Sequence, residues 1–163
     1  NTITGNASNN VITGGASTDN FFGSLGNDTY TGNAGSNTLN YSSLSSGNID
    51  VQWDGVGNTI IKSAGGTDSF TGVQTINGTA LTTDRLTLLT TGLTVQVSGA
   101  YFSPDALATL IGVERVEGSA GSDTIFSMSG AGVNNTINGN AGDDIIYGGN
   151  GTAGLHDSLQ HDL

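Results

Sequence analysis

The chain repeats a nine-residue unit that begins with glycine and carries an apolar side chain near its end. The unit appears in GNASNNVIT from Gly5, GGASTDNFF from Gly14, GSLGNDTYT from Gly23 and GNAGSNTLN from Gly32, and again in GSAGSDTIF from Gly118, GAGVNNTIN from Gly130 and GNAGDDIIY from Gly139. A short fixed period of this kind indicates a stack of similar coils rather than a chain folded around one central core.

Two columns of the repeat each hold one kind of side chain, once looser copies ending near Asp84 and near 157–160 are included. The eighth position is always apolar or aromatic: Ile3, Ile12, Phe21, Tyr30, Leu39, Leu86, Ile125, Ile137, Ile146 and Leu159. The sixth position is always Asn or Asp: Asn1, Asn10, Asp19, Asp28, Asn37, Asp84, Asp123, Asn135, Asp144 and Asp157. One register therefore satisfies two independent constraints.

These columns predict an all-β fold, a parallel β-roll or β-helix solenoid. The glycine-rich part of each unit turns tightly because glycine tolerates positive φ, and the last three residues alternate sides as a short strand. Two units complete a coil, and coils stack about 4.8 Å apart with the eighth position inward. Only 34% of the residues are hydrophobic, so this core is thin and other interactions must hold the turns.

The best copies, GSLGNDTYT, GSAGSDTIF and GNAGDDIIY, resemble the nonapeptide repeats of the repeats-in-toxin (hemolysin-type) exoproteins, G-G-x-G-x-D-x-U-x with U apolar. The resemblance covers about half of the chain, at both ends. It implies an extracellular protein that holds Ca²⁺ between stacked turns, through sixth-position carboxylates and backbone carbonyls of the glycine-rich loops. Calcium suits such a site because it accepts six to eight oxygen ligands in tolerant geometry.

On this resemblance we expect the strongest metal site where Asp123 and Asp144 supply two carboxylates, beside the loops of Gly121 and Gly142. Sites with one carboxylate or with Asn are expected to be weaker, and they comprise Asp28 facing Asn10 beside the loop of Gly26, Asp19 between Asn1 and Asn37, and Asn135 facing Asp157. An alternative without metal remains open, because Asp and Asn also favour glycine turns through local hydrogen bonds to the backbone.

Residues 41–117 break the nine-residue period but contain a duplication of their own. GNIDVQW (47–53) parallels GLTVQVS (92–98), and TGVQTINGTA (71–80) parallels IGVERVEGSA (111–120). We therefore expect one solenoid over 1–163, with nonapeptide coils at 1–40 and 118–163 and two wider, irregular coils at 41–117. Strands are predicted at 49–53, 59–61, 86–89 and 93–97, with Tyr41 and Trp53 packed beneath them. Ser103-Pro104-Asp105 predicts one short helix near 104–110.

The charge balance excludes several classes of partner. Fourteen acidic residues against three basic ones give a net charge of −11, and Lys62, Arg85 and Arg115 are scattered in the sequence. Nucleic acid is not an expected partner, because binding requires several basic side chains to neutralise phosphates. No apolar run is long enough for membrane insertion, and the absence of cysteine excludes disulfides.

Catalysis is not expected either. The HExxH, GxSxG and phosphate-loop motifs are absent. The two histidines, His156 and His161, lie in the last eight residues, and Glu114 and Glu117 would point to opposite sides of a strand. We therefore predict no active site.

The leading hypothesis is a secreted, calcium-binding structural solenoid of a bacterial surface layer, extracellular filament or adhesin, which folds on binding calcium outside the cell. An alternative is the calcium-dependent carboxy-terminal module of an exported enzyme of the lipase, protease or epimerase type. Ice binding is a third reading, but Asn20 and Phe22 interrupt the threonine ladder. Because Asn1 already occupies a sixth position, we expect open ends, hence a fragment of a longer solenoid or copies that associate end to end.

Overall fold

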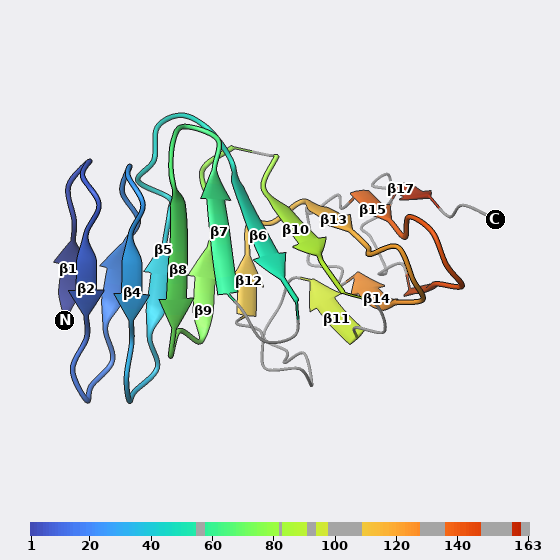
Figure 1. Ribbon diagram of the computed structural model, residues 1–163. Helices are drawn as coiled ribbons and strands as arrows, with labels where there is room; N and C mark the ends of the chain where they lie inside the picture. Colours follow the sequence, from blue (N-terminus) through green and yellow to red (C-terminus); the bar gives the residue numbers. More distant parts are fainter. Residues whose placement is uncertain are drawn as a thin grey trace, which may run out of the picture.

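The protein is a stack of short strands joined by turns, and the computed structural model places β1 and β17 at opposite ends of the stack (Figure 1). The structure describes residues 1–54, 58–81, 83–90, 94–97, 109–127, 136–147 and 158–160. Every regular secondary-structure element in these ranges is a β-strand, as the repeat predicts. Within the same ranges, no helix has the length and apolar content to span a membrane.

The strands form three sheets. In spatial order, the five-stranded sheet holds β1 (Thr2–Thr4), β3 (Asn20–Phe22), β5 (Thr38–Asn40), β9 (Thr75–Asn77) and β12 (Thr109–Ile111). The nine-stranded sheet holds β17 (Ser158–Gln160), β15 (Thr136–Asn138), β13 (Arg115–Glu117), β10 (Arg85–Leu88), β6 (Ile49–Trp53), β7 (Asn58–Lys62), β8 (Thr67–Thr71), β4 (Thr29–Thr31) and β2 (Val11–Thr13). The three-stranded sheet holds β11 (Thr94–Val97), β14 (Thr124–Ser127) and β16 (Ile145–Tyr147).

Successive nonapeptides alternate between two sheets, so neighbouring strands within a sheet come from units two repeats apart. Ile3 is the register partner of Phe21, which is the partner of Leu39, while Ile12 pairs with Tyr30 in the other sheet. The parallel register keeps the eighth-position side chains in straight inward columns. The predicted parallel β-roll is thereby confirmed.

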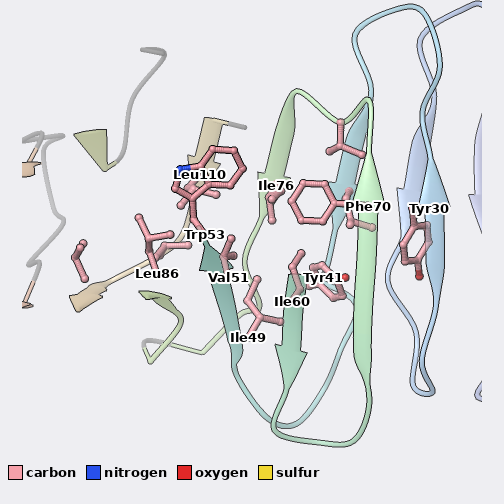
Figure 2. Close-up of a cluster of buried hydrophobic side chains, with 14 of the residues drawn as sticks. Tyr30, Tyr41, Ile49, Val51, Trp53, Ile60, Phe70, Ile76, Leu86 and Leu110 are labelled. Atoms are coloured by element: carbon pink, nitrogen blue, oxygen red, sulfur yellow. The ribbon is translucent and has the colours of Figure 1, made fainter. Parts of the chain in front are cut away.

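These columns form the buried core that Figure 2 draws in close-up. The eighth-position residues buried in it are Ile12, Phe21, Tyr30, Leu39, Leu86, Ile125 and Ile137. Tyr41 and Trp53 also lie in this core, at 0% and 2% exposure, which confirms their predicted packing role. The strands contribute few apolar side chains each, so the core is a narrow ladder along the stack.

Glycine at the fourth position permits the coils to stack closely. Gly26 and Gly142 have φ values of 95° and 117°, in the left-handed region that favours glycine. A Cβ atom at Gly26 would lie 2.8 Å from the carbonyl oxygen of Ser8 in the adjacent coil, and one at Gly142 would lie 2.6 Å from the carbonyl carbon of Gly121. The turns therefore pack backbone against backbone.

The middle of the chain contains a reversal that the sequence reading did not anticipate. Strands form where predicted, but β7 pairs antiparallel with both β6 and β8. β8 continues the parallel order beyond β4, and β6 pairs in parallel with β10. The segment from β6 to β8 is thus a meander that widens the nine-stranded sheet on one side of the stack (Figure 1).

The prediction of a short helix near 104–110 is wrong for the two residues that the structure describes. Thr109 and Leu110 belong to β12, and residues 104–108 lie outside the described residues. Leu110 is 3% exposed and is the register partner of Ile76, so it extends an inward column. Pairing with β9 and burial of Leu110 outweigh the local helix signal at these positions.

Candidate metal centre

Sixth-position side chains connect each coil to the previous one. In every such rung, a side-chain oxygen accepts a hydrogen bond from the backbone N–H of the equivalent residue one coil earlier, and strand register places Asp68, Gln74 and Glu114 in this column as well. The rungs are Asn10 N–H to Asp28 (2.9 Å), Asp19 N–H to Asn37 (3.0 Å), Asp28 N–H to Asp68 (2.9 Å), Asn37 N–H to Gln74 (2.7 Å), Asp84 N–H to Glu114 (3.1 Å) and Asp123 N–H to Asp144 (2.9 Å). The column is therefore part of the backbone hydrogen-bond network.

The carboxylates of Asp19, Asp84 and Asp123, whose N–H groups donate in these rungs, each hold their own turn through Oδ2. Asp19 Oδ2 accepts from the N–H of Gly15 at 2.8 Å, and Asp123 Oδ2 accepts from the N–H of Ser119 at 2.8 Å. Asp84 Oδ2 accepts from the N–H of Thr79 at 2.6 Å. Asp19 also accepts from the Asn1 amide and Asp84 from Ile49 N–H in the previous coil, so each of the two fixes the separation of two coils, and this role requires no metal ion.

Asp123 and Asp144 lie together, at the position from which the sequence predicts the strongest site. Asp123 is buried, and the Ser119 hydroxyl donates to its Oδ2 at 2.8 Å. Asp144 uses Oδ1 for the rung to Asp123 N–H, while its Oδ2 is buried and has no hydrogen-bond partner among the described residues. A buried carboxylate oxygen without a partner is costly, so this atom suits contact with a cation.

The loops beside this pair fit an oxygen-rich calcium site. Gly142 packs against the backbone of Gly121 in the adjacent coil, which brings two glycine-rich turns together at the stacked carboxylates. Among the described residues, no three acidic or histidine side chains gather closely enough to hold a metal ion. A cation at Asp123 and Asp144 therefore needs backbone carbonyls as additional ligands, a donor set that calcium accepts.

A second stacked pair, Asp84 and Glu114, was not among the predicted ligands. Asp84 is fully buried, and burial raises its pKa although Ile49 N–H and Thr79 N–H donate to it. Burial, followed by the charge of Asp84, also raises the pKa of Glu114. The charge of Asp84 thus disfavours the ionisation of Glu114, which is an electrostatic condition that a divalent cation relieves.

A third stacked pair, Asp28 and Asp68, already contains a positive charge. The Lys62 ammonium forms a hydrogen bond with Asp68 Oδ1 and lies 3.6 Å from Asp28 Oδ2. All three side chains are fully buried. The structure therefore pairs Asp28, predicted as a calcium ligand, with a lysine of β7.

The amino-terminal candidates are mostly engaged with amides. The Asn1 side chain donates to Asp19 Oδ1 at 2.6 Å, and this hydrogen bond is the main reason that the pKa of Asp19 is lowered. The Asn37 amide donates to the carbonyl of Gly72 at 2.9 Å. Asn135 and Asp157 lie outside the described residues.

The two arginines form ion pairs on the outer face of the nine-stranded sheet. Arg85 and Arg115 lie far apart in the sequence but are register partners on β10 and β13. Arg85 pairs with Asp50 at 2.6 Å, and Arg115 pairs with Glu117 at 2.8 Å. Glu117 therefore contacts a different partner from Glu114, and the two do not form a pair of cooperating acids.

Comparison with protein families identifies the repeats. Residues 1–30, 22–40, 110–131 and 134–152 match four copies of the RTX calcium-binding nonapeptide repeat. These stretches include the Asp123 and Asp144 turns and the amino-terminal coils. A comparison with curated proteins gave no match.

Proposed function

We propose, from the premise that this chain belongs to the RTX calcium-binding nonapeptide repeat family, that it is a secreted structural solenoid whose coils lock on binding calcium outside the cell. The proposed setting is a bacterial surface layer, extracellular filament or adhesin. The observation that carries calcium locking is the buried Asp144 Oδ2 next to the buried Asp123, because this oxygen has no hydrogen-bond partner in the part of the chain that the structure describes.

The charge balance supports locking by an external cation. The chain has 14 acidic and three basic residues, and its buried acids lie in columns along the stack. Like charges at this spacing oppose compaction unless cations intervene. A site with a Kd of about 10⁻⁴ M stabilises the folded state by about 1.4 kcal/mol in millimolar calcium, and by almost nothing at cytosolic calcium levels.

In the proposed mechanism, Asp123 and Asp144 hold the ion together with carbonyls of the Gly121 and Gly142 loops. Bound calcium supplies the positive charge that offsets the two carboxylates. Ser119 orients Asp123 by donating its N–H and its hydroxyl to Oδ2, and Asp144 Oδ1 keeps the coils in register through Asp123 N–H. Asp84 and Glu114 provide a second stacked pair for the same role.

A calcium titration followed by circular dichroism tests this function. Protein stripped with a chelator is expected to show a weaker β-sheet signal and a lower urea midpoint than protein in millimolar calcium. Magnesium is the matched control, because it demands near-ideal octahedral geometry and retains its waters. An unchanged spectrum and midpoint after complete chelation would contradict calcium-dependent locking.

End-to-end association is part of this proposal. β1 and β2 form the edges of their sheets, and parallel edge strands can pair with strands of another copy. Light scattering in calcium is expected to show species larger than a monomer as concentration rises. A monomer at every concentration tested would remove self-assembly from the proposal.

The second candidate function is the calcium-dependent carboxy-terminal module of an exported lipase, protease or epimerase. It is favoured by the engagement of Arg85, Arg115 and Glu117 in ion pairs, which leaves catalysis to another domain. The complete gene decides between the two candidates. A catalytic domain encoded upstream supports the module, whereas further repeats support the structural solenoid.

A further inference from the structure

One buried cluster in the solenoid holds a cation that the chain itself supplies. Lys62 ends β7, and its ammonium lies between Asp28 of one coil and Asp68 of the next. Asp28 N–H donates to Asp68 Oδ1 at 2.9 Å, the same rung that joins the other stacked turns. The ammonium therefore lies at a junction between two stacked sixth-position carboxylates.

The remaining oxygens of this cluster accept from hydroxyl groups. Tyr41 donates to Asp68 Oδ2 at 2.6 Å, and Tyr30 donates to Asp28 Oδ2 at 3.2 Å. Ser24 also donates to Asp28 Oδ2, at 3.0 Å. Two negative charges are thus offset by one ammonium and three hydroxyl donors, which is the kind of satisfaction that a buried charge requires.

The three stacked carboxylate pairs differ in this respect. Asp28 and Asp68 hold the buried Lys62, whereas the two arginines of the chain form their ion pairs elsewhere, Arg85 with Asp50 and Arg115 with Glu117. The lysine arrives on the reversed strand β7, which interrupts the parallel stack at this point.

We propose that Lys62 permanently replaces calcium at the junction between Asp28 and Asp68. A divalent ion is excluded there because the ammonium already occupies the space between the carboxylates and would repel it. The β4–β8 junction is therefore independent of calcium, while the Asp123–Asp144 junction depends on it. The statement about the Asp123–Asp144 junction rests on the proposed calcium locking, whereas the statement about the β4–β8 junction does not.

Two amide protons provide a matched test in the unaltered chain. Asp28 N–H and Asp123 N–H make the same 2.9 Å bond to a carboxylate of the next coil, and Lys62 contacts the carboxylate of the first bond. Hydrogen exchange followed by NMR is expected to show Asp28 N–H protected with and without calcium. Protection of Asp123 N–H is expected only with calcium.

The outcomes separate the two proposals. If both amides lose protection on chelation, the calcium-independent junction is refuted while calcium locking stands. If neither amide responds, calcium locking is refuted, and the lysine variants below decide the role of Lys62. Loss of protection at Asp28 N–H alone would contradict both proposals.

Substitutions of Lys62 test whether the cluster is a replaced metal site. Lys62→Ala removes the charge and leaves room for an ion, whereas Lys62→Met removes the charge but fills the space. In chelator, both are expected to accelerate exchange at Asp28 N–H by roughly 100-fold or more, because two buried carboxylates lose their counter-ion. Calcium is expected to restore protection in Lys62→Ala and not in Lys62→Met.

Terbium reports directly on an ion at this position. Tyr30 and Tyr41 contact the two carboxylates, so Tb³⁺ bound between them would be sensitised by tyrosine excitation. Lys62→Ala is expected to bind one more Tb³⁺ than the unaltered chain, with added tyrosine-sensitised emission that Lys62→Ala/Asp68→Asn lacks. No gain in bound ions by Lys62→Ala would overturn the replacement of calcium by lysine, as would equal rescue of both Lys62 variants.

Discussion

Asp144→Asn separates the metal-binding role of this carboxylate from its structural role. Asn retains an oxygen to accept from Asp123 N–H, so the 2.9 Å rung between the coils persists. The buried Oδ2, which accepts no hydrogen bond from the described residues, is replaced by an NH₂ group that cannot bind calcium. The substitution therefore removes one of two carboxylate ligands and leaves the stacking contact in place.

The expected magnitude follows from binding linkage. If the loss of one carboxylate weakens a site of about 10⁻⁴ M by about tenfold, the stabilisation in 1 mM calcium falls from about 1.4 to about 0.4 kcal/mol. The variant should therefore be about 1 kcal/mol less stable in calcium, equivalent to a melting temperature lower by about 2 to 4 °C for a chain of this size. In chelator its stability should match that of the unaltered protein.

Asp143→Asn is the control, because Asp143 is exposed and the substitution makes the same change in net charge. Urea denaturation in calcium and in chelator measures all four states. The reasoning is refuted if Asp144→Asn and Asp143→Asn lose equal stability in calcium, or if the Asp144→Asn deficit persists unchanged in chelator.

Three further predictions address the core, the turns and the effect of pH. Ile76→Ala, at a fully buried core position, should cost about 3 kcal/mol in urea denaturation, and a cost below about 1 kcal/mol would contradict the single-residue core ladder. Gly66→Ala should destabilise more than Gly65→Ala in the same assay. Both residues have positive φ, but only at Gly66 would a Cβ meet the backbone of the facing turn, so equal costs would argue against close turn packing. Finally, the raised pKa values of Asp84 and Glu114 mean that the folded state binds more protons than the unfolded state, so stability in chelator should fall as pH rises from about 4 through these pKa values. Calcium should remove this loss by binding the ionised acids. The measurement is the urea midpoint at pH 5 and at pH 7, and a difference between the two midpoints that is the same with and without calcium would contradict this prediction.

The repeat predicts most of the fold because it specifies both the turn and the strand. Glycine at the fourth position permits the positive φ seen at Gly26 and Gly142, and the eighth position gives the inward columns. The sixth position is harder to interpret, because the same Asp or Asn suits a hydrogen bond to the backbone and a metal ion. The structure places the hydrogen bonds, and the assignment of individual calcium ligands remains a proposal.

One missed repeat carried a recognisable signal. SAGGTDSFT, from Ser63 to Thr71, has glycine at the fourth position, Asp68 at the sixth and Phe70 at the eighth, but begins with serine instead of glycine. The requirement for an initial glycine excluded it. Gln74 and Glu114 were missed for a related reason, since they replace Asp or Asn two residues before an inward apolar side chain.

Other features depend on contacts that sequence does not express. Lys62 lies six residues before Asp68 but 34 after Asp28, and only the reversal at β7 brings its ammonium between them. The alternation at 49–53 and 59–61 predicts strands but carries no direction, because parallel and antiparallel strands share the same period. The strand at Leu110 could not be predicted for a similar reason, because it forms by pairing with the strand of Ile76, which is distant in the sequence.

The rungs that connect the coils all run one way: the earlier coil gives the proton and the later coil receives it. In a polypeptide that emerges amino end first, the backbone N–H of each new turn would therefore lack its acceptor until the next turn has folded. Truncation at the two ends should therefore have different effects. Removal of the last turn leaves a backbone N–H of the preceding turn without its acceptor, whereas removal of the first turn leaves a side-chain oxygen that water or an ion can solvate.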